Sequence, residues 1–189
     1  MVKIGFIVEG DTEKILFSSS AFQNYLNSIN INYIPQIINA EGNGNLLPHN
    51  ISEYTQTLID KGAEKIFIIT DLDSDECVTK TKKRIKPNDI HQCIISRKTI
   101  ESWFLADTQT IRKYLNSADY ICETPETLEN PFQEIKNQRM AHINKGVSDK
   151  KILVKTLLNL GLSFESIISN PNCNSAKYFH NKLIQYSNN

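Results

Sequence analysis

Four short runs of apolar, mostly β-branched residues recur along the first half of the chain. They lie at Lys3–Val8, Tyr33–Asn39, Lys65–Thr70 and His91–Ser96. Their starting points are about 30 residues apart, the length of one strand followed by one helix. Nearly continuous apolar runs are typical of strands buried on both faces of a sheet. The pattern therefore predicts four strands separated by helices.

The segments between these runs have the spacing of amphipathic helices. The apolar positions that share one helical face after the first run are Ile15, Phe22, Tyr25, Leu26 and Ile29, and those after the second are Ile51, Tyr54, Leu58 and Ile59. Alternating strands and helices with crossovers this short indicate a parallel sheet with right-handed connections. We therefore predict an α/β fold in which a parallel sheet is flanked by helices.

After Thr99 the strand pattern stops and helical patterns take over. The stripe from 100 to 115 fits one long helix or two consecutive ones, with Asp107 as the cap of the second. Further helices are expected around Asp149–Leu160, Phe164–Ser169 and Ala176–Tyr186. We therefore divide the chain into an α/β domain at residues 1–107 and a helical cap at residues 108–189 that packs on it.

Composition narrows the class of protein. The chain has 189 residues, enough for one ordinary core, and its net charge is zero, which argues against a strongly basic nucleic-acid clamp. Its four cysteines lack C-x-x-C spacing and are expected to be reduced, buried thiols. An acidic N-terminus without a signal-peptide pattern, and the lack of a long apolar run, predict a soluble, cytoplasmic protein that does not enter a membrane.

Charge is nevertheless uneven along the chain. Residues 76–98 hold seven Lys or Arg and two acids, and residues 136–155 hold six Lys or Arg and one acid. These runs are either solvated helix faces or a phosphate-binding rim. The candidates for nucleic-acid contacts in the first run are Lys82, Lys83, Arg84, Arg97 and Lys98.

Acidic residues follow the predicted strands at the point where each strand ends. Glu9 ends the first strand, Asp71 and Asp73 end the third, and Glu101 lies one helical turn beyond the fourth. Ligands of open parallel sheets bind at the carboxyl ends of the strands. We therefore expect these carboxylates to converge on one edge.

The spacing favours a hard cation. Alternate residues of an extended chain point the same way, so Asp71 and Asp73 can present two carboxylates together. Crowded carboxylates without His or Cys suit Mg²⁺ or Mn²⁺. Glu13 is either part of this site or an ordinary acid of a first helical turn, and Asp75 is either a further ligand or a cap of the next helix.

These motifs resemble those of the Toprim domain, which topoisomerases, primases, ribosomal RNA maturases and OLD-family nucleases share. The first match is the E-G-x-x-E pattern from Glu9 to Glu13, and the second is the D-x-D pattern of Asp71 and Asp73. Residues 97–107 further resemble a block in small stand-alone bacterial Toprim proteins, some of them encoded beside ATPases in anti-phage loci. The resemblance covers residues 1–107 and implies a Toprim- or Rossmann-like sheet.

The resemblance implies roles for individual residues. Glu9 would be a metal ligand or general acid/base, and Asp71 and Asp73 would hold one or two Mg²⁺ or Mn²⁺ ions. Glu13, and Glu101 beside it, would join a second metal site. Lys98 or Arg97 would meet the scissile phosphate. The resulting expectation is a metal-dependent nuclease of DNA or RNA that acts as an effector in phage defence, with an ABC/AAA-type ATPase subunit as a candidate partner.

Two alternatives from other classes stay open. Ile68–Asp73 also fits the strand and D-x-D motif of a haloacid-dehalogenase-like phosphatase, with Asp71 as nucleophile, although that motif normally lies on the first strand. The chain can also be a non-catalytic Toprim-like module that binds a partner. The sequence leaves open whether it forms a homo-oligomer.

Overall fold

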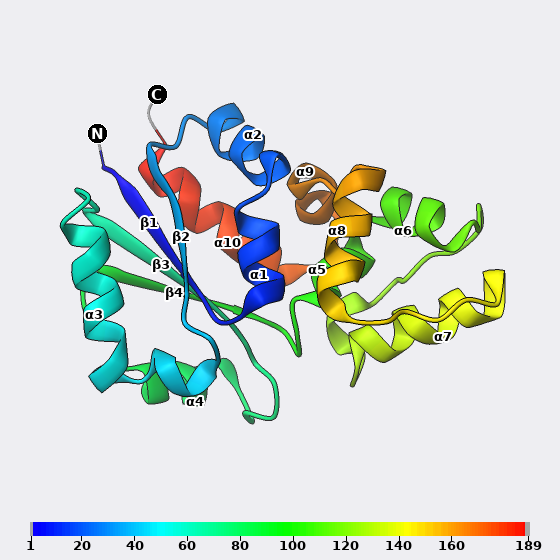
Figure 1. Ribbon diagram of the computed structural model, residues 1–189, viewed down its shortest axis with the longest axis horizontal. Coiled ribbons are helices and arrows are strands. Elements are labelled where there is room, and N and C mark those ends of the chain that lie inside the picture. The colour runs from blue at the N-terminus through cyan, green and yellow to red at the C-terminus, as the bar shows by residue number, and fades with distance from the viewer. Residues whose placement is uncertain (1, 188–189) are drawn as a thin grey trace.

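The centre of the molecule is a four-stranded parallel sheet (Figure 1). The computed structural model describes residues 2–187. Its strands are β1 (Ile4–Val8), β2 (Tyr33–Asn39), β3 (Lys65–Asp71) and β4 (His91–Ser96). They lie in the order β2-β1-β3-β4, and every neighbouring pair is parallel. The chain leaves β1 for β2 on one side and later returns to β3 on the other, so the topological switch point lies between β1 and β3.

Helices cover both faces of the sheet, which confirms the predicted α/β class. The first face is covered by α1 (Asp11–Phe17), α2 (Ser20–Ser28) and α10 (Asn174–Leu183), and the second by α3 (Pro48–Ile59) and α4 (Val78–Ile85). On the first face, the Phe6 ring lies 5.2 Å from that of Phe22 and the Phe67 ring lies 6.0 Å from that of Phe179. Aromatic side chains bury large apolar areas and dominate such a core.

On the second face the sheet approaches α3 closely. A Cβ atom at Gly5 would lie 2.9 Å from Leu58 Cδ1, so any side chain at this position would have to displace Leu58 of α3. The remaining one-turn helices are η1 (Asn43–Leu46), η2 (Pro125–Thr127) and η3 (Ile184–Tyr186).

The other helices lie beside the sheet, on the right in Figure 1. They are α5 (Glu101–Ala106), α6 (Thr108–Leu115), α7 (Pro131–Ile143), α8 (Lys150–Leu160) and α9 (Phe164–Ser169). Helix α8 packs on α1, and the returning helix α10 packs on β4. One hydrophobic cluster includes Phe6 of β1, Leu157 of α8 and Phe164 of α9. The buried core therefore runs across the predicted division between residues 107 and 108.

The helices differ from the sequence pattern in two places. The apolar face that follows β1 belongs to two helices, because Ser19 caps the second one and its hydroxyl accepts a hydrogen bond from the Phe22 amide at 3.2 Å. Helix α7 had no predicted counterpart, since only Pro131 and Ile135 of its residues are buried and no apolar stripe marks it. The Asp107 cap is confirmed, because its carboxylate accepts from the Thr110 amide at 3.1 Å and separates α5 from α6.

The cysteines are free thiols, but only two of the four are buried. Cys93 and Cys173 are enclosed, whereas Cys77 is exposed and Cys122 is half-buried. Cys77 directly precedes α4 in a loop on the surface, where no core element reaches it. Within residues 2–187, every helix is too short or too polar to cross a lipid bilayer.

Candidate functional site

The candidate site lies at the switch point, where β1 and β3 end. Glu9 directly follows β1, and its Oε2 atom accepts hydrogen bonds from the Thr70 hydroxyl at 2.5 Å and from the Asp71 amide at 3.1 Å. These two contacts fix the Glu9 carboxylate against the end of β3. Its other oxygen, Oε1, accepts no hydrogen bond from the described residues.

Asp71 is the last residue of β3 and is buried. The Ser96 hydroxyl of β4 donates to its Oδ1 atom, so two neighbouring strands hold this carboxylate. Burial raises the pKa of Asp71 well above its usual range, and the nearby charges of Glu13, Glu101 and Glu9 raise it further, against the opposing effect of Ser96. Asp71 is therefore the centre of a group of interacting carboxylates.

Glu13 is part of this group although it lies on a helix. It occupies the first turn of α1 and is buried. Its Oε2 atom lies over Gly10, where an added Cβ would approach it to 3.2 Å. Burial, followed by the charges of Glu9 and Glu101, raises the pKa of Glu13 from 4.5 to about 7. The structure therefore brings together the four carboxylates of Glu9, Glu13, Asp71 and Glu101.

A single lysine partly compensates this negative charge. Glu101 is completely buried at the start of α5, and Lys150 at the start of α8 places its ammonium 3.1 Å from Oε1 and 3.2 Å from Oε2 of Glu101. Partial burial alone would lower the pKa of Lys150, but the charges of Glu101, Asp71 and Glu13 raise it. One partly exposed cation thus interacts with three buried carboxylates.

This donor set fits a divalent cation in its chemistry. Carboxylates whose pKa values are raised by burial and by mutual repulsion are stabilised by a hard cation, and Mg²⁺ and Mn²⁺ prefer oxygen ligands. In residues 2–187, no three His, Cys, Asp or Glu side chains already form a metal-binding group. Binding would therefore require side-chain rotation, for which the exposed Asp73 has the freedom.

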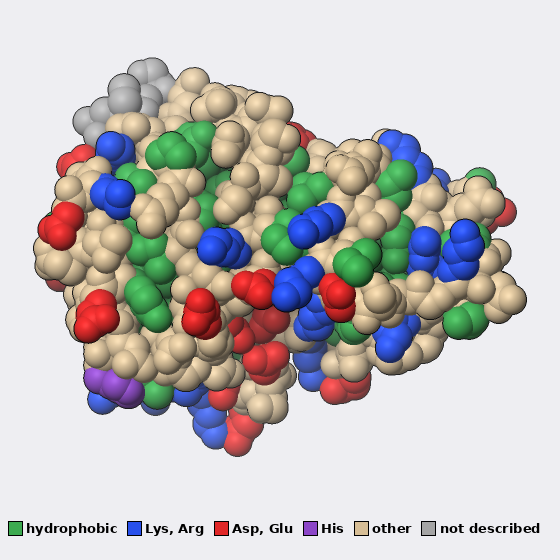
Figure 2. Space-filling view, viewed as in Figure 1, with side chains coloured by type: hydrophobic (Ala, Val, Ile, Leu, Met, Phe, Trp, Pro, Cys, Tyr) green, Lys and Arg blue, Asp and Glu red, His purple; other side chains and the backbone are tan. Residues whose placement is uncertain are grey.

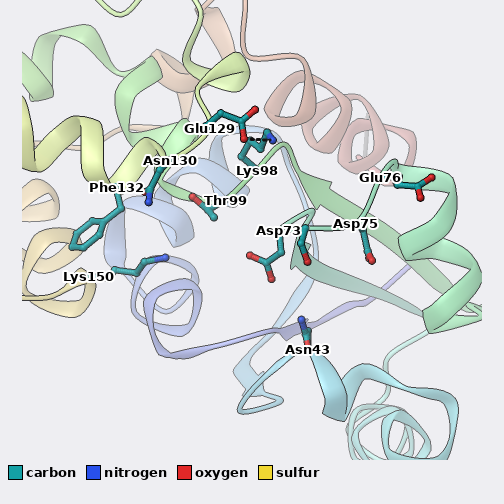
Figure 3. Close-up of a pocket in the computed structure, with 11 residues that line it drawn as sticks. Asn43, Asp73, Asp75, Glu76, Lys98, Thr99, Glu129, Asn130, Phe132 and Lys150 are labelled. Carbon is teal, nitrogen blue, oxygen red and sulfur yellow. Dashed lines mark hydrogen bonds and ion pairs between the residues drawn. The ribbon is translucent and has the colours of Figure 1, made fainter.

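A cleft of about 870 Å³ opens beside these carboxylates (Figure 3). Asp73 and Lys150 line it from opposite sides, and the side chain of Lys98 reaches Glu129 at 3.0 Å on its border. Thr99 also lines the cleft, and its buried hydroxyl has no hydrogen-bond partner. Figure 2 shows acidic and basic side chains gathered near the middle of the molecule, between the sheet and the outer helices. The cleft thus offers carboxylates and cations to one ligand.

The loops that carry Asp73 and Lys98 are joined to each other. The Asp73 amide donates to the Lys98 carbonyl at 2.9 Å. Both residues have left-handed backbones, with φ of 48° and 63°. Non-glycine residues in this region are uncommon and concentrate at functional sites.

The remaining residues proposed from the sequence do not belong to the group of four carboxylates, although Asp75 lines the same cleft as Asp73. Asp75 accepts from Thr81 at 2.8 Å and from Arg84 at 3.1 Å, and these contacts lower its pKa, with Thr81 as the larger cause. Its role as a metal ligand stays a prediction, as does nucleic-acid binding by the basic residues. Lys82 lies with Arg97 on a separate groove. Lys83 is an exposed residue of α4.

The residues missed by sequence reasoning are three partners of the carboxylates and one residue of the cleft. The partners are Lys150, Thr70 and Ser96, and Thr99 lines the cleft. Lys150 lies within a basic run that the sequence does mark, but nothing in that run singles out this lysine. Thr70 is the last but one residue of β3 and Ser96 is the last residue of β4, and a polar side chain among the apolar ones of a strand end is a usable signal.

The fold and site define an α/β protein with an open parallel sheet and an acidic site at its topological switch point. Comparison with known families is more specific: the chain belongs to the RloB-like protein family, whose model matches residues 5–182. The C-terminal region of the Burkholderia pseudomallei OLD protein has the same fold. The two structures align with a TM-score of 0.51 and 16% identity over 96% of this chain and 98% of that one. No curated protein matches the chain.

Proposed function

We propose that this protein is a Toprim-type nuclease that hydrolyses phosphodiester bonds in DNA or RNA with the help of Mg²⁺ or Mn²⁺. The observation that carries the proposal is the group formed at the switch point by three buried carboxylates and the half-buried Glu9. Lys150 connects this group to a cleft that Lys98 also lines. Support also comes from the fold shared with the OLD region and from the E-G-x-x-E and D-x-D motifs.

In this proposal Glu9, Asp71 and Asp73 hold the metal, and Glu13 and Glu101 extend the site for a second ion. A bound Mg²⁺ or Mn²⁺ supplies an activated water and balances the charge that develops on the phosphate. The hydrogen bonds that orient the carboxylates of Glu9 and Asp71 would help to set the affinity of these residues for the metal.

The cations of the cleft bind the substrate. Lys150 and Lys98 each have one acidic partner, Glu101 and Glu129 respectively, which a phosphate group can replace. The unpaired Thr99 hydroxyl can donate to a phosphate oxygen. Lysine and hydroxyl donors contact the nucleic-acid backbone without reading its sequence, so we expect little sequence specificity from these residues.

The cellular role of this nuclease is a prediction from the family resemblance. The resemblance to stand-alone bacterial Toprim proteins favours an effector in phage defence that acts with an ATPase. A partner requirement would appear as a nuclease that is silent alone and active in the complex.

The test is cleavage of supercoiled plasmid, single-stranded DNA and total tRNA in Mn²⁺ by the wild type and by Asp71→Asn. We expect cleavage that EDTA abolishes and that falls at least a hundredfold in the variant, since metal ligands act in the reaction itself. Asp119→Asn, a change of an exposed acid in the loop before α7, is the matched control and should cleave normally.

The outcomes separate the candidate functions. Activity that survives in Asp71→Asn contradicts the assigned site. Turnover of a phosphomonoester that fluoroberyllate inhibits, without cleavage of nucleic acid, would support the phosphatase alternative instead. Far-ultraviolet circular dichroism of the variant separates lost activity from lost fold.

A further inference from the structure

The sheet has an open outer edge along β4. β4 is the last strand in the order, so one of its sides pairs with β3 and the other has no strand beside it. The Leu72 amide donates to the Ser96 carbonyl at 3.0 Å, so Ser96 turns its backbone toward β3. Backbone direction alternates along a strand, and Cys93 and Ile95 therefore turn their amide and carbonyl groups outward. The one contact from the described residues is weak: the Gln92 side-chain amide lies 3.4 Å from the Cys93 carbonyl oxygen.

A groove of about 250 Å³ follows this edge between α4 and α10. Cys93 and Ile95 form part of its lining and are only 3% and 5% exposed. Val78 of α4 and Tyr178 of α10 line it from the two helices and are 37% and 38% exposed, although both are large and largely apolar. Backbone groups with so little access to water gain from a hydrogen-bonding partner, and an unpaired edge is a template for another strand.

The groove carries positive charge without negative charge. Lys82 and Arg97 are its charged residues, and no acid lines it. The Lys82 ammonium lies 5.3 Å from the centre of the Tyr178 ring, so this side chain spans the groove from α4 to α10. Lys182 lies 5.6 Å from the same ring. In residues 2–187, none of these three cations pairs with a carboxylate.

We propose that this groove binds an extended segment of a partner protein, which adds to β4 as a fifth strand and carries acidic side chains beside apolar ones. The backbone of the segment pairs with Cys93 and Ile95, and its apolar side chains pack on Val78 and Tyr178. Its carboxylates draw Lys82 away from the Tyr178 ring, which opens the groove. The site lies outside the proposed catalytic cleft.

Charge and lining favour this occupant over two others. A second copy of the chain pairing along the same edge would place two sets of unpaired cations against each other. The phosphates of a nucleic acid would satisfy the cations and could accept from the outward amides, but they have no donors for the outward carbonyls and no apolar groups for the lining. An acidic peptide strand satisfies the cations, the amides and the apolar side chains together.

The first experiment measures binding of a fluorescein-labelled peptide, Glu-Val-Val-Glu-Val-Val-Glu, by fluorescence anisotropy. As a strand, this peptide presents apolar and acidic side chains on both faces. We expect saturable binding that Lys82→Glu weakens at least tenfold. Lys83→Glu changes the neighbouring residue of α4, which does not line the groove, and should stay within twofold of the wild type. N-methylation of alternate peptide amides should abolish binding, because it removes the donors of the strand. Equal binding of a peptide with lysine at the acidic positions, or equal effects of the two variants, would overturn the proposal.

Hydrogen exchange and sedimentation identify the occupant directly. The amides of Cys93 and Ile95 should exchange at least tenfold more slowly with the peptide bound. Protection of these amides by a single-stranded oligonucleotide, with no effect of the peptide, would assign the groove to nucleic acid and end the proposal. A dimer in sedimentation that Val78→Glu disrupts would assign it to a second copy and would also end it.

Discussion

Glu13→Gln in metal-free protein is expected to change how stability depends on pH. The native pKa of Glu13 is raised from 4.5 to about 7, chiefly by burial, so the folded protein holds this proton after the unfolded chain has released it. A group that binds more protons in the folded state makes stability fall as pH rises. The free energy of unfolding should therefore decrease between about pH 4.5 and pH 7 in EDTA.

The size of the effect follows from the shift. A change from 4.5 to about 7 corresponds to about 3 kcal/mol of unfolding free energy for one carboxyl. Asp71 titrates in the same direction and shares part of the repulsion with Glu13. Removing the Glu13 charge should thus make the variant more stable than the wild type by about 2–3 kcal/mol at pH 8, and leave the two nearly equal at pH 4.

The measurement is urea denaturation from pH 4 to pH 8 in EDTA, followed by the fluorescence of Trp103. This residue is the chain's one tryptophan and is completely buried, so its emission reports loss of the core. Glu53→Gln, on the exposed side of α3, is the matched control and should keep the wild-type slope. If the unfolding free energy of Glu13→Gln depended on pH as steeply as that of the wild type, the reasoning would be refuted. Adding Mn²⁺ at pH 8 should stabilise the wild type more than the variant.

Three further changes test the packing around the site by the same denaturation. Lys150→Ala should destabilise the protein by about 2 kcal/mol, because it leaves Glu101 buried without a counter-ion, and adding Glu101→Gln should recover most of the loss. Gly5→Ala should cost about 1–2 kcal/mol through crowding against α3, whereas Gly146→Ala, where an added Cβ meets nothing, should stay within about 0.5 kcal/mol. Asp107→Ala should cost about 2 kcal/mol, since its carboxylate caps α6 and also accepts from a second amide; unchanged midpoints would contradict the cap.

The strands could be predicted because burial on both faces gives β1 and β3 nearly continuous apolar sequences, and shorter apolar runs mark β2 and β4. The same logic failed for α7, whose apolar positions do not share a face because few of its side chains enter the core. The break between α1 and α2 depends on one hydroxyl, that of Ser19, turning to the backbone. Apolar spacing cannot distinguish such a cap from a small residue inside a helix.

The proximity of Glu9 and Asp71 could be predicted from the strand ends alone, since the carboxyl ends of parallel strands lie at one edge of the sheet. The contact of Lys150 with Glu101 joins residues 49 positions apart in the helical part of the chain. No local sequence pattern predicts such a contact, because α8 packs on α1 and α6 through residues that are far apart in the sequence.

The contact between Lys150 and Glu101 crosses the predicted division of the chain between residues 107 and 108. The first part supplies Glu9, Glu13, Asp71 and Glu101, yet Lys150 and the packing of α8 on α1 come from the second. Exposed carboxylates in water would have ordinary pKa values, and burial is the largest cause of the shifts at Glu13 and Asp71. The helices beyond residue 108 therefore help to create the electrostatic character of the site. The acidic edge and its helical cover form one physical unit, even though the sequence divides them by pattern.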